Sequence, residues 1–258
     1  MASFKILNTR PTAQAAEFSA LVTSSTQQAI ELPCLQIVPG PELQNLEKSL
    51  KLKEEEATSV KSWIVFTSSN GVRSVAERFD LSDFLAEMKI ASIGEKTKQS
   101  LEEHGVKVDF SPKEQNSIGF GREFSGAPAA KLFLLRGDLA NKGLVETLDS
   151  RGFDVTDLVV YKSEAPSYSN QQLRETLSDL NPSSSMIVLL SGQAAKNLKE
   201  YSVQVDCWSM LSQVPVAVIG PVTAEAVLSE GYNLEISASR PDVVALASEI
   251  NDWILAKK

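Results

Sequence analysis

IGPVTAEAVLSEGYNLEIS, residues 219–237, echoes an earlier stretch of the chain, IGEKTKQSLEEHGVKVDFS, residues 93–111. Both begin with Ile-Gly-x-x-Thr, continue through a helix-like segment that ends at Gly, and finish in a short extended segment that ends at Ser. Glycine after a helix and apolar residues beyond it predict a helix followed by a strand. The offset is 126 residues for three pairs: Gly94 and Gly220, Thr97 and Thr223, and Gly105 and Gly231.

Two further matches extend this similarity to either side. IVFTSSNGV, residues 64–72, aligns with IVLLSGQAA, residues 187–195, at an offset of 123. LNTRP, residues 7–11, aligns with FLLRG, residues 133–137, which pairs Arg10 with Arg136 at an offset of 126. Because the matches are collinear, the chain is predicted to contain two related halves.

Short apolar runs alternate with amphipathic stretches along the whole chain. Alternation of this kind predicts an α/β fold in which parallel sheets are covered by helices. The predicted strands are residues 4–9, 31–38, 62–68, 89–94, 106–111, 131–137, 155–162, 185–191, 215–220 and 232–238.

Composition narrows the functional classes. The 258 residues are enough for one large domain or two small ones, and the net charge of −8 with no basic cluster argues against a nucleic-acid partner. No apolar run approaches the roughly 20 residues that span a bilayer, and the start of the chain lacks a secretory pattern, so we expect a cytoplasmic protein without a membrane partner. Two distant cysteines, Cys34 and Cys207, are expected to be free thiols, and a single histidine, His104, excludes a His-rich metal site.

Small polar residues recur where a predicted strand passes into a helix. Ligands of parallel α/β sheets collect at the carboxyl ends of the strands, and helix N-termini bind anions through backbone N–H groups. For any one position taken alone, helix capping is the better explanation of a Ser or Thr. Equivalent positions in both halves favour one large polyanionic ligand. These candidate binding residues are Thr67, Ser68, Ser69, Gly94, Thr97, Ser191, Gly192, Gly220 and Thr223.

Two further side chains have two interpretations each. Tyr161 ends the β-branched run of VVYKS, residues 159–163, and is either a core aromatic with a bonded hydroxyl or a proton donor at the edge of a cleft. Arg10 ends a predicted strand and either binds a ligand carboxylate or pairs with an Asp or Glu of the protein.

The order and spacing of six motifs resemble the uroporphyrinogen-III synthase family along nearly the whole chain. The motifs are TRP (9–11), FTSSNGV (66–72), IGEKT (93–97), VVYKS (159–163), LLSG (189–192) and IGPVTAEAV (219–227).

The resemblance implies two α/β domains, each a parallel sheet flanked by helices, joined by a two-stranded linker. One domain is expected to combine residues 1–34 with 166–258 and the other to be residues 38–161, with crossings near 34–38 and 161–166. The active site is expected in a cleft between the domains. Two loops, with Gly94 and Thr97 on one and Gly220 and Thr223 on the other, are expected to face it from opposite sides.

The resemblance also implies an activity of porphyrin and heme biosynthesis. Linear hydroxymethylbilane loses water and closes to uroporphyrinogen III with inversion of its last pyrrole ring, without a metal or organic cofactor. A monomer is implied, with handover of the substrate by the preceding pathway enzyme. The alternative is a non-catalytic two-lobed binding or sensor protein on the same fold. The family's polar cleft positions fall on Ser68, Thr97, Tyr161, Ser191 and Thr223, with Tyr161 as the candidate proton donor.

Overall fold

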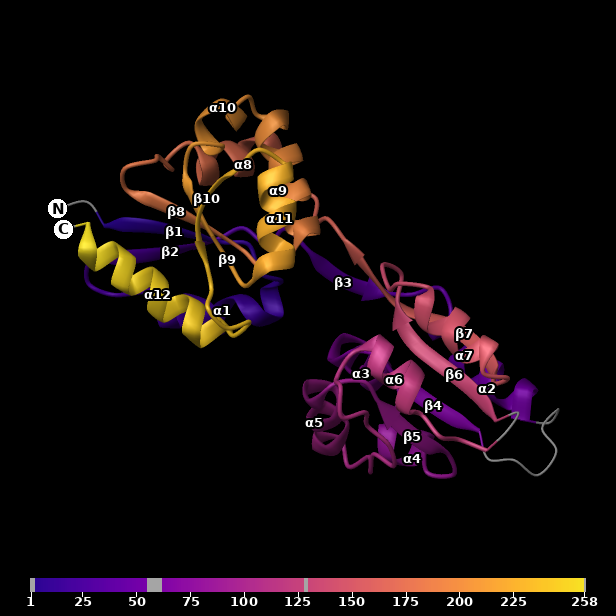
Figure 1. Ribbon diagram of the computed structural model, residues 1–258. Helices are drawn as coiled ribbons and strands as arrows, with labels where there is room; N and C mark the ends of the chain where they lie inside the picture. The colour runs from indigo at the N-terminus through magenta and orange to yellow at the C-terminus, as the bar shows by residue number, and fades with distance from the viewer. Residues whose placement is uncertain (1–2, 55–61, 128–129, 258) are drawn as a thin grey trace. The chain divides into compact units, whose positions relative to one another are not determined.

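The structure is a computed structural model that describes residues 3–54, 62–127 and 130–257, and the chain forms two compact units (Figure 1). Unit 1 combines Met1–Gln36 with Glu164–Lys258, and unit 2 is Ile37–Ser163. The chain leaves unit 1 through β3 (Gln36–Pro39) and returns at the end of β7 (Asp154–Glu164). These two strands are neighbours in one sheet, so the two passages between the units run through paired strands.

Unit 1 contains a five-stranded parallel sheet in the order β10-β9-β8-β1-β2. Strands β1 and β2 come from the start of the chain and the other three from its last third. Parallel strands must be joined by crossover connections, and here these are helices. The strands are β1 (Phe4–Asn8), β2 (Gln27–Glu31), β8 (Ser185–Leu189), β9 (Pro215–Val218) and β10 (Asn233–Ser237).

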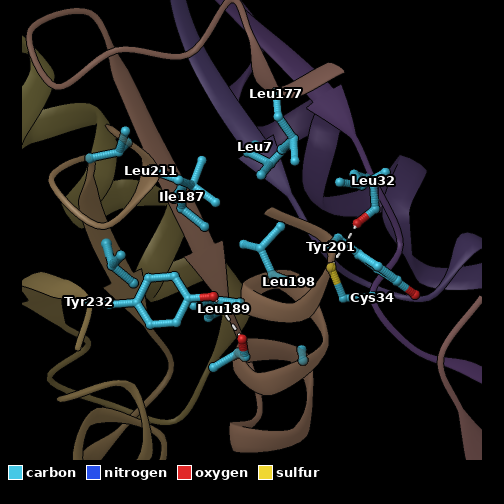
Figure 2. Packing of buried hydrophobic residues seen from close by; sticks show 14 of the residues in the cluster. Leu7, Leu32, Cys34, Leu177, Ile187, Leu189, Leu198, Tyr201, Leu211 and Tyr232 are labelled. Carbon is cyan, nitrogen blue, oxygen red and sulfur yellow. Dashed lines mark hydrogen bonds between the residues drawn. The ribbon is translucent and has the colours of Figure 1, made fainter. Parts of the chain in front are cut away.

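Helices cover both faces of this sheet. Because side chains alternate along a strand, Ile6 packs on one face with α1 (Thr12–Val22) and α12 (Val243–Ala256). Leu7 packs on the opposite face, where Figure 2 shows it beside Ile187 and Leu198. The helices on that face are α8 (Asn170–Leu177), α9 (Gly192–Gln204), α10 (Trp208–Leu211) and α11 (Pro221–Ser229).

Unit 2 contains a second five-stranded sheet in the order β3-β7-β6-β4-β5. Strands β4 (Trp63–Phe66), β5 (Lys89–Ser92), β6 (Lys131–Gly137) and β7 are parallel. One face packs against α2 (Leu46–Glu54) with the short 3-10 helix Leu43–Asn45, α3 (Ser69–Ala76), α4 (Leu81–Phe84) and α5 (Glu95–Glu103). The other face packs against α6 (Ser117–Glu123) and α7 (Gly143–Ser150).

The internal repeat is visible in the strand registers. Leu7 pairs with Ile187 in unit 1, and their equivalents Phe133 and Ile64 pair in unit 2. Three further strand pairings of unit 1 have an equivalent in unit 2. Ile187–Val216 corresponds to Ile64–Ile90, Ala217–Ile236 to Ala91–Phe110, and Leu7–Ile30 to Phe133–Thr156.

The predicted fold class is therefore confirmed: two parallel-dominated sheets flanked by helices. Each sheet combines the first two strands of one repeat with the later strands of the other. The exchange is between β1 and β2 of the first repeat, and β6 and β7 of the second.

Two predicted strands differ from the structure. The predicted strand 31–38 is divided in the structure, because β2 ends at Glu31 and β3 (Gln36–Pro39) belongs to the other sheet. The rest of β2 was missed because QQAIE is a half-buried edge strand without a continuous apolar run. Residues 106–111 were expected to form a strand, but they make a single bridge, Ala91 to Phe110, where unit 1 has β10. Among the helices that the structure describes, none is both long enough and apolar enough to cross a membrane.

Candidate active site

Each sheet contains a switch point, where the connections from two neighbouring strands lead to opposite sides of the sheet. In unit 1 the connection from β1 leads to one side of the sheet and that from β8 to the other; in unit 2 the same holds for β4 and β6. The loops therefore diverge beyond the carboxyl ends of these neighbouring strands, which is where open α/β sheets bind ligands. Arg10 and Ser191 follow β1 and β8, while Ser68 follows β4.

In unit 2 a tyrosine hydroxyl lies at a helix N-terminus. Tyr161 Oη is 2.9 Å from Ser68 Oγ, and either atom can donate the hydrogen bond. Ser68 is the N-cap of α3, and its Oγ accepts a hydrogen bond from the backbone N–H of Gly71 at 3.2 Å. Tyr161 as a whole is half-buried.

A β-bulge directs Tyr161 to this position. Arg136 pairs with Val159 but Gly137 pairs with Tyr161, so Val160 is an extra residue on β7. A bulge reverses the alternation of side chains, so Val160 and Tyr161 both pack on the α3 face of the sheet. Gly137 makes room for the ring, because a Cβ there would lie 2.5 Å from Tyr161 Cζ. We call Ser68, Gly137 and Tyr161 the phenol cluster.

The neighbouring predicted residues have protein partners of their own. Thr67 uses both its backbone N–H and its hydroxyl to donate to the carbonyl of Leu135, at 3.3 and 3.4 Å. Ser69, the first residue of α3, has its Oγ 3.4 Å from the Arg73 guanidinium, which donates to it. Thr67, Ser68, Ser69 and Tyr161 thus lie together at the carboxyl end of β4.

The two Ile-Gly-x-x-Thr loops have matching geometry in their own units. Gly94 and Gly220 are the N-caps of α5 and α11, and neither has a positive φ that would require glycine. A methyl group at either position would meet no described protein atom within 4 Å. Thr97 and Thr223 are buried, and within the described residues their hydroxyls make no hydrogen bond to protein. These loops therefore have open space and available hydroxyls, whereas Ser68 is already a cap.

Ser191 and Gly192 have structural roles. Ser191 is the N-cap of α9, and its Oγ accepts from the backbone N–H of Ala194 at 3.1 Å, as Ser68 does in α3. A Cβ at Gly192 would lie 2.7 Å from Ala226 Cβ, so glycine here allows α9 and α11 to approach closely. Packing alone accounts for this glycine.

Arg10 is buried without a full set of partners. Its side chain is 9% exposed, and its Nη2 donates to Gln14 Oε1 at 3.1 Å. Among the described residues, Nε and Nη1 have no hydrogen-bond partner, and the Glu17 carboxylate is 3.9 Å from Nη1, beyond hydrogen-bond length. Burial lowers the pKa of Arg10, and the charge of Glu17 opposes this. A buried guanidinium with two unused donors suits a planar anion.

Arg136, the repeat equivalent of Arg10, is fully paired. Its Nε and Nη2 both donate to the carboxylate of Asp157, the second at 2.5 Å, and its Nη1 donates to the carbonyl of Asn141 at 2.7 Å. This bidentate pair is 4% exposed on the arginine side. The protein itself uses every part of this guanidinium, which makes Arg136 structural.

Tyr168, the nearest alternative to Tyr161, belongs to the interior of unit 1. Its hydroxyl donates to the carbonyl of Pro33 at 2.9 Å, its ring packs against Tyr201, and burial raises its pKa. Sequence reasoning missed Gln14 and Gly137, the contacts of Arg10 and Tyr161. The only signal available for Gly137 was a glycine at the end of an apolar strand.

Comparison with known proteins was consistent across sequence and structure. Residues 16–248 match the model of the family described as uroporphyrinogen-III synthase HemD. The chain is 26% identical over 259 residues to a uroporphyrinogen-III synthase from Synechococcus elongatus, covering 96% of this chain and 94% of the relative. In fold it is similar to the Helicobacter pylori uroporphyrinogen-III synthetase, with a TM-score of 0.66, 17% identity, and coverage of 98% of this chain and 100% of that one.

Proposed function

The chain belongs to the uroporphyrinogen-III synthase HemD family, a family of cyclising lyases in porphyrin biosynthesis, and from this premise we propose how its residues carry out the reaction. The substrate is linear hydroxymethylbilane, which closes to uroporphyrinogen III with loss of water and inversion of the last pyrrole ring. The substrate carries an acetate and a propionate on each ring. The enzyme must therefore hold several carboxylates, assist departure of a hydroxyl, and fix the geometry of ring closure.

Tyr161 is the proposed proton donor. The bond between the terminal carbon and its hydroxyl oxygen breaks, the oxygen takes the phenol proton, and water leaves. The electron pair of the pyrrole nitrogen stabilises the carbon that remains, as an azafulvene-like species. The proton released when the ring closes returns to the phenolate, so no proton is consumed overall. The observation that carries this proposal is the position of Tyr161 Oη, 2.9 Å from the N-cap of α3, where the helix dipole stabilises a developing negative charge.

Arg10 is the proposed anchor for one substrate carboxylate. Two of its guanidinium nitrogens are buried and unpaired among the described residues, while its charge is not neutralised by a hydrogen-bonded acid. A carboxylate that accepts two hydrogen bonds from this fork would satisfy both donors. The charge-assisted contact would fix the orientation of one ring and leave the others to adapt.

The Ile-Gly-x-x-Thr loops are proposed to bind further carboxylates. Open space at Gly94 and Gly220 lets a carboxylate approach the backbone N–H groups of α5 and α11, and the hydroxyls of Thr97 and Thr223 are available as donors. We further propose that the protein acts as a monomer in the cytoplasm, where free thiols such as Cys34 persist, and receives its substrate from the preceding pathway enzyme.

The deciding experiment supplies enzymically generated hydroxymethylbilane and measures the ratio of type III to type I isomers after oxidation. Linear substrate closes without inversion in water, so an excess of type III isomer reports the activity. Type I product alone would contradict it and favour a non-catalytic binding or sensor protein.

Tyr161→Phe then tests the residue. It keeps the ring and removes only the hydroxyl, and general-acid assistance contributes on the order of 10²- to 10⁴-fold to rate. We expect a loss near the lower end of this range, because the leaving group departs readily. Wild-type turnover in Tyr161→Phe would show that the phenol is only part of the wall of the site.

A further inference from the structure

We propose that Ser68 and Gly137 are positioning residues for the Tyr161 proton: Ser68 donates its hydroxyl proton to the phenol oxygen, and Gly137 holds the ring where this bond can form. This inference rests on the proposed role of Tyr161 and goes beyond it. Ser68 then acts through the phenol, in contrast to its predicted role as a substrate ligand.

We assign Ser68 as the donor of the Ser68–Tyr161 hydrogen bond, in which either oxygen can donate. A serine hydroxyl has one proton to donate and two lone pairs. Ser68 Oγ already accepts from the backbone N–H of Gly71, so its proton points away from α3. Tyr161 Oη, 2.9 Å away, is the described acceptor for that proton. When Ser68 donates, the phenol proton is free to be given to the departing hydroxyl.

The same hydrogen bond becomes stronger as the reaction proceeds. Once the phenol has given up its proton, its oxygen carries a negative charge, and a hydrogen bond to a charged acceptor is roughly twice as strong as a neutral one. Ser68 needs no rearrangement to supply it, because its Oγ is fixed as the cap of α3. An interaction that is stronger in the transition state than before it raises kcat rather than substrate binding.

Gly137 sets the position of the ring. A Cβ at residue 137 would lie 2.5, 2.6 and 2.8 Å from Cζ, Cε2 and Oη of Tyr161, all closer than real Cβ contacts. Any other residue here would displace the phenol from Ser68. Gly71 is the matched comparison, because a Cβ there would lie 3.8 Å from Tyr161 Cε1, which is ordinary van der Waals contact.

Unit 1 shows that the cap itself does not need a phenol. Ser191 caps α9 with φ −154° and ψ 152°, against −154° and 154° for Ser68, and each Oγ accepts from the backbone N–H three residues further on. The position equivalent to Tyr161 is Leu35, a partly buried apolar side chain. A phenol on the serine cap is therefore particular to unit 2.

A double-mutant cycle of Ser68→Ala and Tyr161→Phe tests the proposal. We expect Ser68→Ala to lower kcat about 10- to 100-fold with little change in KM, and Ser68→Thr to recover most of this loss. The double variant should be no slower than Tyr161→Phe alone, because Ser68 acts only through the phenol. Independent, multiplicative losses, or a raised KM with unchanged kcat, would overturn the proposal and make Ser68 a direct substrate ligand.

Three comparisons complete the design. Ser169→Ala removes the serine cap of α8, which belongs to unit 1 rather than to the unit of Tyr161, so it reports the cost of a lost cap on stability, with turnover unchanged. Gly137→Ala should lower kcat at least tenfold, whereas Gly71→Ala should retain most of it; equal effects would refute the role of Gly137. If Tyr161→Phe itself turns over like the wild type, the proposed donor fails. If Tyr161→Phe is slow, but its loss of kcat and that of Ser68→Ala multiply in the double variant, only the positioning role of Ser68 fails.

Discussion

The two units share one frame but present different chemistry at equivalent positions. Arg10 in unit 1 and Arg136 in unit 2 are both buried; Arg10 follows β1 and Arg136 lies near the end of β6, each a strand at the switch point of its sheet. Arg136 is neutralised by Asp157, while Arg10 has two donors without a partner in the described chain. Burying a charge without a partner is costly, so a fold tolerates it where a ligand supplies the partner.

The serine caps of the two units also differ, and here it is unit 2 that has the additional functional group. Ser68 in unit 2 is hydrogen-bonded to the phenol of Tyr161, whereas the repeat equivalent of Tyr161 in unit 1 is the apolar Leu35. Unit 1 therefore retains a cation whose nearest described acid, Glu17, is 3.9 Å away and beyond hydrogen-bond length, and unit 2 retains a hydroxyl that can give up a proton.

The largest expected difference between the units appears at alkaline pH. Burial raises the pKa of Tyr168, Tyr201 and Tyr232, all in unit 1, and burial also raises the pKa of Cys34 there. Figure 2 shows the Tyr232 hydroxyl bonded inside this core. Because each folded-state pKa lies above its unfolded value, each contribution is complete below the unfolded pKa, about 8.5 for Cys34 and about 10 for the tyrosines, and is lost as the pH rises.

Unit 1 should consequently unfold before unit 2 as the pH is raised from 9 to 11.5. Hydrogen exchange followed by mass spectrometry, with labelling times corrected for intrinsic exchange, would locate the loss of protection to residues 3–36 and 164–257. Earlier exposure of unit 2 peptides would contradict this order.

The next largest effect concerns the paired arginine. Arg136→Met leaves the Asp157 carboxylate without its partner, and breaking a buried pair costs about 3–5 kcal/mol. Asp157 is 32% exposed, so we expect a smaller cost of about 2–3 kcal/mol in the stability of unit 2. Arg10→Met should change the stability of unit 1 by less than about 1 kcal/mol, because it removes an unsatisfied charge. Urea unfolding monitored by hydrogen exchange in each unit measures both.

The two arginines are expected to have the opposite ranking in their effect on KM. A hydrogen bond to a charged group contributes about 1.5–3 kcal/mol, so Arg10→Met should raise KM by about 10- to 100-fold. Arg136→Met, assayed at a temperature where it is folded, should have a KM close to that of the wild type. Equal effects of the two variants on KM would remove the distinction between the arginines.

Gln14→Glu would give Arg10 a carboxylate partner, as Asp157 is for Arg136. Gln14 Oε1 already accepts from Arg10 Nη2 at 3.1 Å, and the substitution replaces an amide by a carboxylate of nearly the same shape. We expect KM to rise at least about tenfold, with unit 1 no less stable, since the new acid competes with the substrate carboxylate. Gln14→Met, which carries no charge, is the matched control and should have a smaller effect. An unchanged KM in Gln14→Glu would exclude carboxylate binding by Arg10.

The smallest expected effects are those of the two loop threonines. Thr97→Val and Thr223→Val keep the shape of the side chain and remove a hydroxyl that bonds to no described protein group. Each should raise KM about five- to tenfold while changing stability by less than about 0.5 kcal/mol. Thr176→Val on α8, whose hydroxyl donates to the carbonyl of Gln172, should leave activity unchanged. A variant that loses stability but keeps its KM would identify that threonine as structural.

Much of the candidate site could be predicted from the sequence because its residues lie at ends of repeated segments. Ser68 and Ser191 were found by their place between an apolar strand and a helix, and both are N-caps in the structure. The two alternatives for Tyr161, a bonded hydroxyl or a proton donor, could not be separated from VVYKS alone. The structure shows the partner of the hydroxyl, and the proton transfer stays a prediction.

The sequence by itself determined the alternation of strands and helices and the repeat, because these follow from periodicity along the chain. It also places acids at equivalent positions, Glu31 and Asp157, one beside each arginine-bearing strand. Only the tertiary structure decided that Asp157 pairs with Arg136 while Glu31 accepts a hydrogen bond from Ser19. It also decided that a bulge at Val160 turns Tyr161 over Gly137 toward Ser68. Such choices depend on contacts between distant segments, where a shift of one residue changes which face a side chain occupies.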